Sequence, residues 1–382
     1  MSENQSTLTH LKTFLQDNWN NAGFNEPTSV QQATIPLILE GKDVIAESPT
    51  GTGKTLAYLL PVLNKIDPAK KNPQAVILAS SQELVMQVLS EIQKWADGSG
   101  ITSASLIGGA SLKRQLEKLK KSPQIIVGTP GRTLELIKQK KLKMHEVKTV
   151  VLDEGDQLLV PEHRGTVSNI IKSTLSERQV LLFSATLPQE TEQAARDLVK
   201  EPKLIAIKKD ETITSAAVDH IYFITEPREK IKVLERLSRI SGIKALVFIK
   251  DIGTLTVTHE KLSYNRVEAG LLHSDLTKVE RQAYLNRFRE GTVSLLLVTD
   301  VAARGLDIKG VTHVVHFDFP KDYTQYVHRS GRTGRFGAEG TVASIVSDRE
   351  LRELKKYGKE LGFTPQEKTF YGGNVVDPEK RR

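Results

Sequence analysis

The sequence predicts an α/β protein with two successive units, each a parallel β-sheet flanked by helices. The chain has 382 residues, which at roughly 150 residues per domain is enough for two or three domains. Short runs rich in β-branched residues alternate with longer amphipathic stretches, the pattern of parallel strands buried between helices. The alternation lapses once, in a polar segment near residue 210, and then resumes, which indicates two units.

Composition excludes several classes of protein. Hydrophobic residues make up 38% of the chain and charged residues 26%, so a predominantly disordered chain is excluded. Cysteine is absent, which excludes disulfide scaffolds, cysteine-ligated metal sites and thiol nucleophiles. No apolar run approaches the ~20 residues that span a bilayer, and the polar N-terminus lacks a signal-peptide pattern. We therefore expect a cytoplasmic protein with no membrane partner.

The chain carries an excess of positive charge. Its 54 Lys and Arg residues exceed its 46 Asp and Glu residues by 8. This balance favours a polyanionic partner, but the excess is spread along the chain and no basic tail dominates.

The first unit is expected over residues 1–208, followed by a linker at 209–217. Its strands are predicted at 43–46, 75–79, 125–127, 149–152 and 180–183.

The second unit is expected over residues 218–363. Its strands are predicted at 220–224, 245–249, 266–270, 294–298, 313–317 and 341–346. The remaining residues, 364–382, show no clear period, so we expect a short, mobile tail.

A glycine-rich segment, E-S-P-T-G-T-G-K-T, follows the first predicted strand and opens a helix. A helix N-terminus with exposed backbone N–H groups binds phosphate. Lys54 would reach the β- and γ-phosphates of a nucleotide, and the Thr55 hydroxyl would ligate Mg²⁺. Ser48 replaces the usual first glycine, and a plain turn between strand and helix is the alternative. The candidate nucleotide-binding residues here are Ser48, Pro49, Thr50, Gly51, Thr52, Gly53, Lys54 and Thr55.

Two further strands end in polar residues. The strand before residue 153 ends in D-E-G-D, where Asp153 is the candidate magnesium ligand and Glu154 the candidate general base for an attacking water. An acidic turn that caps the next helix is the alternative. The strand before S-A-T offers Ser184 and Thr186, which could link the carboxylates to distant elements.

The second unit contains an arginine-rich motif, Y-V-H-R-S-G-R-T-G-R-F-G. Arg329, Arg332 and Arg335 lie three residues apart and present guanidinium groups that suit phosphate charge. A solvated basic loop is the alternative. Because the second half has no phosphate loop, these arginines are expected to complete the site of the first unit.

In this order, from about Phe14 to Gly337, the motifs resemble those of DEAD-box ATP-dependent RNA helicases of superfamily 2. The resemblance implies two tandem RecA-like domains. It also implies an RNA-stimulated ATPase that binds, bends and locally unwinds RNA duplexes or remodels RNA–protein complexes. G-F-N-E-P-T-S-V-Q resembles the adenine-reading Q motif, with Gln31 on the adenine edge, Phe24 stacked on the base and Phe14 as the upstream aromatic residue.

The resemblance also implies roles for individual residues, with ATP and Mg²⁺ as cofactors. The catalytic set is Lys54, Glu154, Arg332 and Arg335, and Asp307 would contact the ribose. Coupling between the domains would use Asp156, Ser184, Thr186, His328 and Arg329. RNA would be bound through its backbone, without sequence preference, by Ser81, Gly108, Gly109, Thr129, Pro130, Gly131, Arg132, Arg281, Thr299 and Arg304. A monomer that acts on ribosomal RNA or pre-ribosomal particles is the expectation.

Several positions depart from the family pattern. Gly155 replaces an alanine, and S-S-Q-E-L stands at residues 80–84 where the family has P-T-R-E-L. Lys278, Ser330 and the segment 249–251 also differ. We therefore expect RNA-stimulated ATPase activity with weak or substrate-selective unwinding. The alternatives are an ATP-gated RNA-binding clamp or chaperone, a DNA helicase of the wider superfamily, and a small-molecule kinase.

Overall fold

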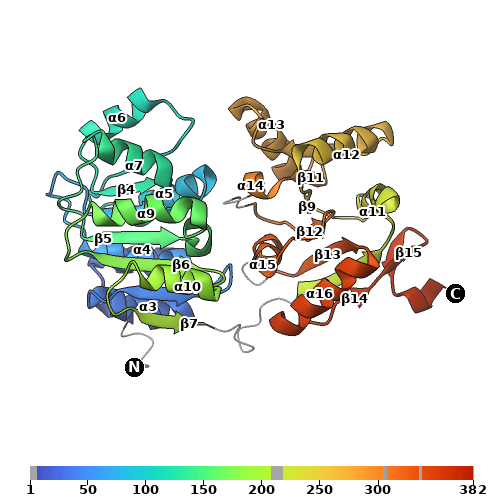
Figure 1. Ribbon diagram of the computed structural model, residues 1–382, viewed down its shortest axis with the longest axis horizontal. Coiled ribbons are helices and arrows are strands. Elements are labelled where there is room, and N and C mark those ends of the chain that lie inside the picture. Colours follow the sequence, from blue (N-terminus) through green and yellow to red (C-terminus); the bar gives the residue numbers. More distant parts are fainter. Residues whose placement is uncertain (1–6, 208–217, 304–305, 307, 335–337, 382) are drawn as a thin grey trace. The chain divides into compact units, whose positions relative to one another are not determined.

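The computed structural model describes residues 7–207, 218–303, 306, 308–334 and 338–381. The chain divides into two compact units, Met1–Asp210 and Glu211–Arg382 (Figure 1). The predicted linker at 209–217 and the candidate residues Arg304, Asp307 and Arg335 lie outside the described residues.

Unit 1 holds a seven-stranded sheet with helices against it. Its strands are β1 (Val44–Glu47), β2 (Ala75–Leu78), β3 (Ser103–Leu106), β4 (Ile125–Gly128), β5 (Thr149–Asp153), β6 (Gln179–Ser184) and β7 (Lys203–Ala206). Its helices are α2 (Thr13–Asn21), α3 (Ser29–Leu39), α4 (Lys54–Lys65), α5 (Gln82–Trp95), α6 (Leu112–Lys120), α7 (Pro130–Lys138), α8 (Gly155–Leu158), α9 (Pro161–Lys172) and α10 (Gln189–Arg196).

Unit 2 holds a second seven-stranded sheet and a two-stranded hairpin. Its strands are β8 (Val218–Ile224), β9 (Ala245–Phe248), β10 (Ala269–Leu272), β11 (Leu295–Val298), β12 (His313–His316), β13 (Gly340–Val346), β14 (Gln366–Glu367), β15 (Thr369–Tyr371) and β16 (Asn374–Val376). Its helices are η1 (Pro227–Glu229), α11 (Lys230–Leu237), α12 (Ile252–Tyr264), α13 (Lys278–Arg289), α14 (Asp300–Ala303), α15 (Tyr323–Ser330), α16 (Asp348–Leu361) and η2 (Pro378–Arg381).

The two seven-stranded sheets share one topology. Their strand orders are β3-β4-β2-β5-β6-β1-β7 and β10-β11-β9-β12-β13-β8-β14, and the paired strands are parallel. Numbered from its own first strand, each sheet therefore reads 3-4-2-5-6-1-7. The predicted fold class, two parallel-sheet α/β units, is confirmed. Each strand of one seven-stranded sheet also has a counterpart at the same place in the other sheet.

Both faces of each sheet are buried, which explains why the strands are apolar throughout. In unit 1 one core packs Val44, Ile77 and Val151 against α2 to α5, while the alternate residues Ile45 and Val76 belong to a second core with α7 to α10. Unit 2 repeats this arrangement, with α13 to α16 in one core and α11 and α12 in the other.

Two strands of unit 1 escape the sequence prediction. β3 reads S-A-S-L, with small and polar residues in place of β-branched ones. β7 is the edge strand, and three of its four residues are exposed. Their pairing partners β4 and β1, rather than any apolar pattern of their own, keep them in the sheet.

Two predictions for unit 2 are wrong. The strand predicted at 266–270 begins only at Ala269, because Arg266 ends the preceding helix with φ +60°. The tail predicted to be mobile instead adds β14 to the sheet beside β8 and folds β15 and β16 into a hairpin. Phe370 of this hairpin stacks on Phe223 at a centroid distance of 4.9 Å. Backbone pairing, this aromatic contact and the Lys368–Asp377 ion pair hold the tail, and none of them leaves a periodic signal in the sequence.

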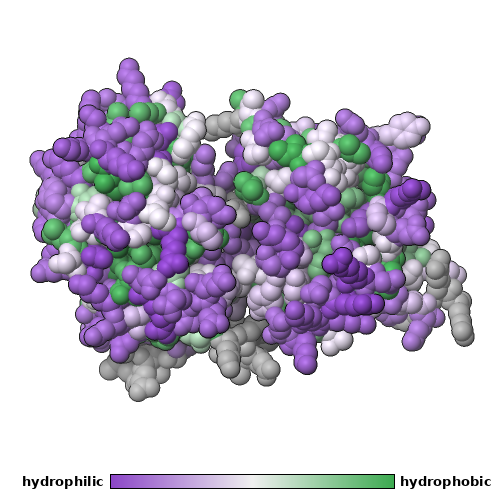
Figure 2. Space-filling view, in the orientation of Figure 1, coloured by the Kyte–Doolittle hydropathy of each residue, from purple (hydrophilic) through white to green (hydrophobic). Residues whose placement is uncertain are grey.

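The visible surface of each unit is mainly hydrophilic, with small separate apolar patches (Figure 2). Among the described residues, no helix combines the length and the apolar character that crossing a membrane requires.

Candidate nucleotide site

The candidate chemistry of unit 1 lies at one edge of its sheet. In a parallel sheet all strands end at the same edge, and ligands bind there. Ser48 follows β1, Ser80 comes two residues after the end of β2, Asp153 ends β5 and Ser184 ends β6. Because β1, β6, β5 and β2 are consecutive neighbours, the polar segments that the sequence separates by up to 136 positions converge.

The glycine-rich loop is fixed to this edge at both ends. The Ser48 N–H donates to the carbonyl of Ser184 at 3.0 Å, and α4 begins at Lys54. Gly51 and Gly53 have φ of +83° and +90°, a conformation that favours glycine. The Lys54 ammonium donates to the carbonyls of Ser48 at 2.5 Å and Pro49 at 2.8 Å. The loop thus presents a helix N-terminus and a lysine to the same space, as an anion site requires.

Gln31 joins the Q-like motif to this loop. Its side-chain oxygen accepts from the Thr28 N–H at 2.9 Å and its amide nitrogen donates to the Gly53 carbonyl at 3.2 Å. A Cβ atom at Gly53 would lie 2.6 Å from that nitrogen, and with φ at +90° the position favours glycine. The Gln31 amide nitrogen keeps one further N–H donor, and its oxygen keeps one further lone pair.

The two predicted aromatic residues, Phe24 and Phe14, have different surroundings. Phe24 is 45% exposed, and its ring stacks on Trp95 with centroids 6.2 Å apart. Phe14 is partly buried and packs against the core of the unit. Phe24, which also contacts Trp19 at 5.1 Å, is therefore the more accessible of the two rings, whereas Phe14 contributes to packing.

Asp153 is a buried carboxylate whose hydrogen-bond donors are neutral groups. The Tyr58 hydroxyl donates to its Oδ2 at 2.8 Å and the Glu154 N–H to its Oδ1 at 3.0 Å. Burial, with the nearby Glu154 carboxylate, raises the pKa of Asp153 to about 6, although the Tyr58 bond and the Lys54 charge act in the opposite direction.

This carboxylate suits a divalent cation. A cation at Asp153 would offset the cost of burial, and the Thr55 hydroxyl is an oxygen ligand of the kind that Mg²⁺ accepts. The described residues contain no group of three or more His, Asp or Glu arranged for a metal. A metal here would thus depend on phosphate oxygens and water for its other ligands, which is usual for Mg²⁺.

The rest of the D-E-G-D segment is fixed by hydroxyl groups. Glu154 adopts φ +53°, and the Ser80 hydroxyl donates to its Oε2 at 2.5 Å. Thr186 donates to Asp156 Oδ2 at 2.9 Å, and the Asp156 N–H donates to the Ser184 hydroxyl oxygen at 3.3 Å. The predicted D-E-G-D and S-A-T segments are therefore in direct contact within unit 1.

Gly155 is required by its neighbour Leu182. A Cβ atom at Gly155 would lie 2.5 Å from Leu182 Cγ and 2.7 Å from its Cδ2. Leu182 itself is fully packed in β6 between β1 and β5. The glycine in D-E-G-D therefore accommodates a large residue on the adjacent strand.

The candidate RNA residues of unit 1 form adjoining loops. Ser81 caps α5, where its hydroxyl oxygen accepts from the Leu84 N–H at 3.1 Å. Gly108 and Gly109 follow β3, and Gly109 has φ +67°. Thr129 to Arg132 open α7, and Arg132 donates to the Ala110 carbonyl at 3.5 Å and pairs with Glu135 at 2.9 Å.

In unit 2 the described candidate RNA residues are Thr299, after a strand, and Arg281, in helix α13. Thr299 follows β11, as Thr129 follows β4. Ile125 and Leu295 pair with Ala75 and Ala245 at the starts of β2 and β9, so the two threonines occupy equivalent positions. Arg281 donates to the Ala302 carbonyl at 3.0 Å, which connects α13 to α14.

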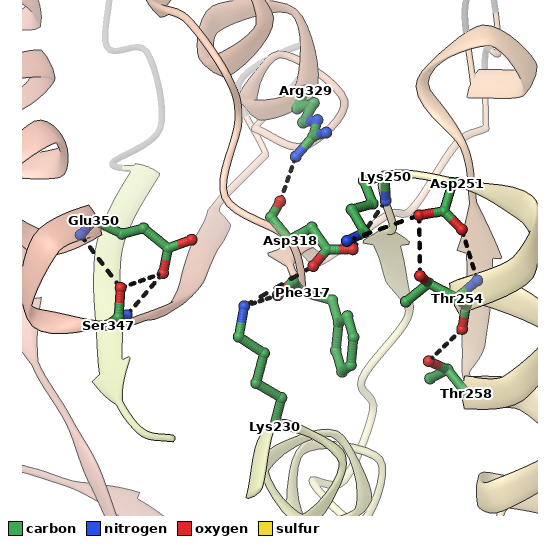
Figure 3. Close-up of polar contacts among 10 residues, drawn as sticks. All are labelled: Lys230, Lys250, Asp251, Thr254, Thr258, Phe317, Asp318, Arg329, Ser347 and Glu350. Carbon is green, nitrogen blue, oxygen red and sulfur yellow. Dashed lines mark hydrogen bonds and ion pairs between the residues drawn. The ribbon is translucent and has the colours of Figure 1, made fainter. Parts of the chain in front are cut away.

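Two of the three arginines, Arg329 and Arg332, lie in the described part of the chain, and their surroundings differ. Arg329 is 3% exposed and bonds Asp300 through two nitrogens at 2.7 Å each. It also donates to the Asp318 carbonyl at 2.7 Å (Figure 3). Donors of Arg329 are thus engaged inside unit 2, and the role predicted for these arginines toward phosphate stays a prediction. Arg332 is partly exposed and donates to the Leu306 carbonyl at 3.0 Å, and His328 is also partly exposed.

Sequence reasoning missed Tyr58, Ser80 and Asp300 as partners of the candidate residues. Tyr58 lies four residues after Lys54 on α4, a helical spacing that could have marked it. Ser80 and Asp300 meet their partners only through the order and register of the strands, which the sequence does not state.

Comparison with known proteins agrees with this architecture. The family model "DEAD/DEAH box helicase" matches residues 28–194, and "Helicase conserved C-terminal domain" matches residues 229–337. The chain is 55% identical to the Bacillus subtilis protein named "Probable ATP-dependent RNA helicase YfmL", over 98% of this chain and 99% of the relative. It is 50% identical to "DEAD-box ATP-dependent RNA helicase CshC" of Bacillus cereus, over 98% and 96%.

The fold also matches a solved helicase. S. cerevisiae Dbp5, in a structure described as bound to RNA and ADP BeF3, superposes with a TM-score of 0.84 at 30% identity, covering 94% of each chain. The predicted RecA-like form of the two units is thereby confirmed.

Proposed function

The chain belongs to the DEAD-box family of ATP-dependent RNA helicases, and from that premise we propose how its residues divide the work of RNA-stimulated ATP hydrolysis. One observation carries the proposal: the glycine-rich loop with Lys54 and the carboxylates of D-E-G-D converge on one edge of the unit 1 sheet. Phosphoryl transfer needs these groups together. Positive charge binds the phosphates, and carboxylates hold a metal ion and orient a water.

At this edge, Lys54 would exchange its two carbonyl partners for the β- and γ-phosphate oxygens of ATP. Thr55 and Asp153 would hold Mg²⁺, which when bound offsets the phosphate charge. Glu154 would orient the attacking water and accept its proton.

Adenine recognition is assigned to the Q-like motif. Gln31 has one donor and one lone pair beyond those used by Gly53 and Thr28, enough for two bonds to the adenine edge. Phe24 would stack on the base with its exposed face. Gln31→Ala is expected to weaken the preference for ATP over GTP in a steady-state ATPase assay. An unchanged preference would contradict this role.

Unit 2 would complete the site when ATP and RNA are bound. Arg332 and Arg335 would stabilise the charge that develops on the γ-phosphate, and Asp307 would bind the ribose. Arg332→Ala is expected to lower turnover by about 10³-fold while changing ATP affinity much less. Turnover near the wild-type rate would refute the use of both units in one site.

RNA would be held by its sugar–phosphate backbone. Thr129 and Thr299 offer hydroxyls at equivalent positions of the two units, and the loops around Gly108 and Arg132 offer N–H groups and a guanidinium. Coupling between RNA and ATP would run through Asp156, Ser184 and Thr186 in unit 1 and through His328 and Arg329 in unit 2.

An ATP-gated clamp or RNA chaperone with little unwinding is the second candidate. It is favoured by Gln82, which stands where the family pattern has arginine and whose amide lies 3.6 Å from the Cβ position of Gly109. A duplex-unwinding assay beside an RNA-stimulated ATPase assay separates the two, because a clamp hydrolyses ATP without releasing strands.

The test of the main proposal is Glu154→Gln. We expect loss of ATP hydrolysis together with slow RNA release in the presence of ATP. Rapid release, or hydrolysis at the wild-type rate, would contradict the general-base role. Crosslinking this variant to cellular RNA and sequencing the RNA would test the proposed role in ribosome assembly, with ribosomal RNA as the expected target. We propose that the protein acts there as a cytoplasmic monomer, which light scattering of the purified chain can check.

A further inference from the structure

Ser80 touches the carboxylate on which hydrolysis is proposed to depend. Its hydroxyl donates to Glu154 Oε2 at 2.5 Å, although 74 positions separate the two residues. In the P-T-R-E-L pattern that this segment resembles, the position of Ser80 is a proline, which has no side-chain donor. The contact is therefore a property of this chain's own sequence.

Strand register explains why the two residues meet. Ala75 of β2 pairs with Thr149 of β5, so the same register, carried two residues past the end of β2, sets Ser80 opposite Glu154. In unit 2, Ala245 of β9 pairs with His313 of β12, which sets Lys250 opposite Asp318. The position opposite the carboxylate supplies a donor there too: the Lys250 N–H donates to Asp318 Oδ2 at 2.9 Å (Figure 3).

The geometry gives the Ser80 hydroxyl a defined task. Glu154 begins the turn after β5 with φ +53°, so its side chain leaves the strand direction. A flexible carboxylate samples several rotamers, and a hydrogen bond to one oxygen restricts them. The bond to Oε2 therefore limits the orientations that the Glu154 carboxylate can adopt.

We propose that Ser80 is a positioning residue for ATP hydrolysis, which holds the Glu154 carboxylate in the orientation that receives the proton of the attacking water. This rests on the proposed function, in which Glu154 is the general base. Ser80 itself would touch neither ATP nor RNA, and its effect would reach the reaction only through Glu154.

The first experiment compares Ser80→Ala with Ser80→Thr in steady-state ATPase assays at saturating RNA. Loss of one orienting hydrogen bond predicts a kcat about five- to tenfold lower in Ser80→Ala, with KM for ATP and ATP-dependent RNA binding within twofold of wild type. Ser80→Thr keeps the hydroxyl at this partly exposed position and should retain the wild-type kcat. A matched control is Ser99→Ala, which removes a hydroxyl bond to the Ala96 carbonyl in the loop before β3 and should change nothing.

The second experiment places Ser80→Ala in the Glu154→Gln background and measures single-turnover hydrolysis. A residue that acts through Glu154 has no further effect once the base is gone, so both Glu154→Gln proteins should hydrolyse ATP equally slowly. A further five- to tenfold loss in the double variant would overturn the positioning role, and so would a wild-type kcat in Ser80→Ala. If Glu154→Gln alone kept the wild-type rate, the proposed function would fail instead, which separates the two conclusions.

Discussion

Glu154 in unit 1 and Asp318 in unit 2 occupy equivalent positions after equivalent strands, but their surroundings differ. The Ser80 hydroxyl, a neutral donor, bonds Glu154. Asp318 accepts from the Lys250 N–H, and the ammonium of Lys230 lies 4.0 Å from its other oxygen (Figure 3). A second carboxylate in each unit shows the same contrast between a neutral and a charged partner. Asp153 in unit 1 accepts a hydrogen bond from the Tyr58 hydroxyl, whereas Asp300 in unit 2 forms an ion pair with Arg329.

The partners of a carboxylate decide how much of its negative charge remains available to a ligand. A hydroxyl that bonds a carboxylate leaves its negative charge in place, so the charge can attract a metal ion or a proton. A guanidinium neutralises the charge and makes the pair part of the scaffold. The bonded carboxylates of unit 1 therefore keep a charge that a ligand can use, whereas the charge of Asp300 is matched by Arg329 inside unit 2.

The largest expected effect is on Asp153. We expect Asp153→Asn to lower kcat by about 10³-fold, because the candidate metal ligand loses its charge. Asp318→Asn makes the same chemical change in unit 2 and should alter kcat by less than about threefold, because its carboxylate has a structural role. ATPase assays at saturating RNA and Mg²⁺ measure both, and similar losses in the two variants would break the comparison.

The next effect is on the stability of unit 2. Arg329→Ala leaves Asp300 without its buried partner, so we expect the free energy of unfolding to fall by about 3 kcal/mol. Denaturant titration followed by circular dichroism would show this loss. Arg332→Ala serves as the control, since that side chain is partly exposed. If Arg329→Ala folded as stably as wild type, the scaffold role of the pair would be refuted.

A smaller effect is expected at Gly155. Gly155→Ala places a methyl group against Leu182, and overpacking of this kind costs about 1–3 kcal/mol. Gly155→Ala with Leu182→Val should be less unstable than the sum of the single variants. Gly165→Ala is the control, because nothing lies within 4 Å of the added methyl group in α9, and it should be neutral or slightly stabilising. Equal losses at Gly155 and Gly165 would contradict the packing explanation.

The smallest effect is a pair of opposite pH dependences. The pKa of Asp153, raised to about 6 by burial, favours the protonated form in the fold, so its contribution to stability is greatest below pH ~4 and is lost as pH rises through 6. Burial lowers the pKa of His316 well below its ordinary value, so its contribution is present above pH ~6.5 and is lost as pH falls below it.

Thermal unfolding of Asp153→Asn and His316→Asn, in EDTA and without nucleotide, measures these contributions. The stabilisation of Asp153→Asn relative to wild type should shrink from pH 7 to pH 4. His316→Asn should become more stable relative to wild type as the pH falls from 7 to 5. Parallel shifts in both variants would contradict the assignment of opposite signs.

The sequence was most informative where chemistry and periodicity coincide. Lys54, Asp153 and Ser184 each follow an apolar run, so both their strands and their convergence at one edge could be predicted. β3 could not, because Ser103 and Ser105 break the apolar pattern, nor could β14, whose residues Gln366 and Glu367 are exposed.

Contacts across strands were beyond sequence reasoning for a different reason. The Ser80–Glu154 bond and the Gly155–Leu182 contact each require both the identity of the neighbouring strand and its register. The resemblance to a family supplied the roles of Gln31 and Arg332 but not the buried pair of Arg329 and Asp300. Motifs thus locate a site, while the partners that tune it come from the fold.

The tail also bears on how copies of this protein behave toward one another. β14 occupies the outer side of β8, where the backbone groups near Ile221 and Tyr222 would otherwise offer a template for a strand from another molecule. A two-residue strand is itself too short to recruit one. β14 therefore protects one edge of the unit 2 sheet against pairing with another molecule, and shortening the protein before Gln366 would expose β8 at that edge.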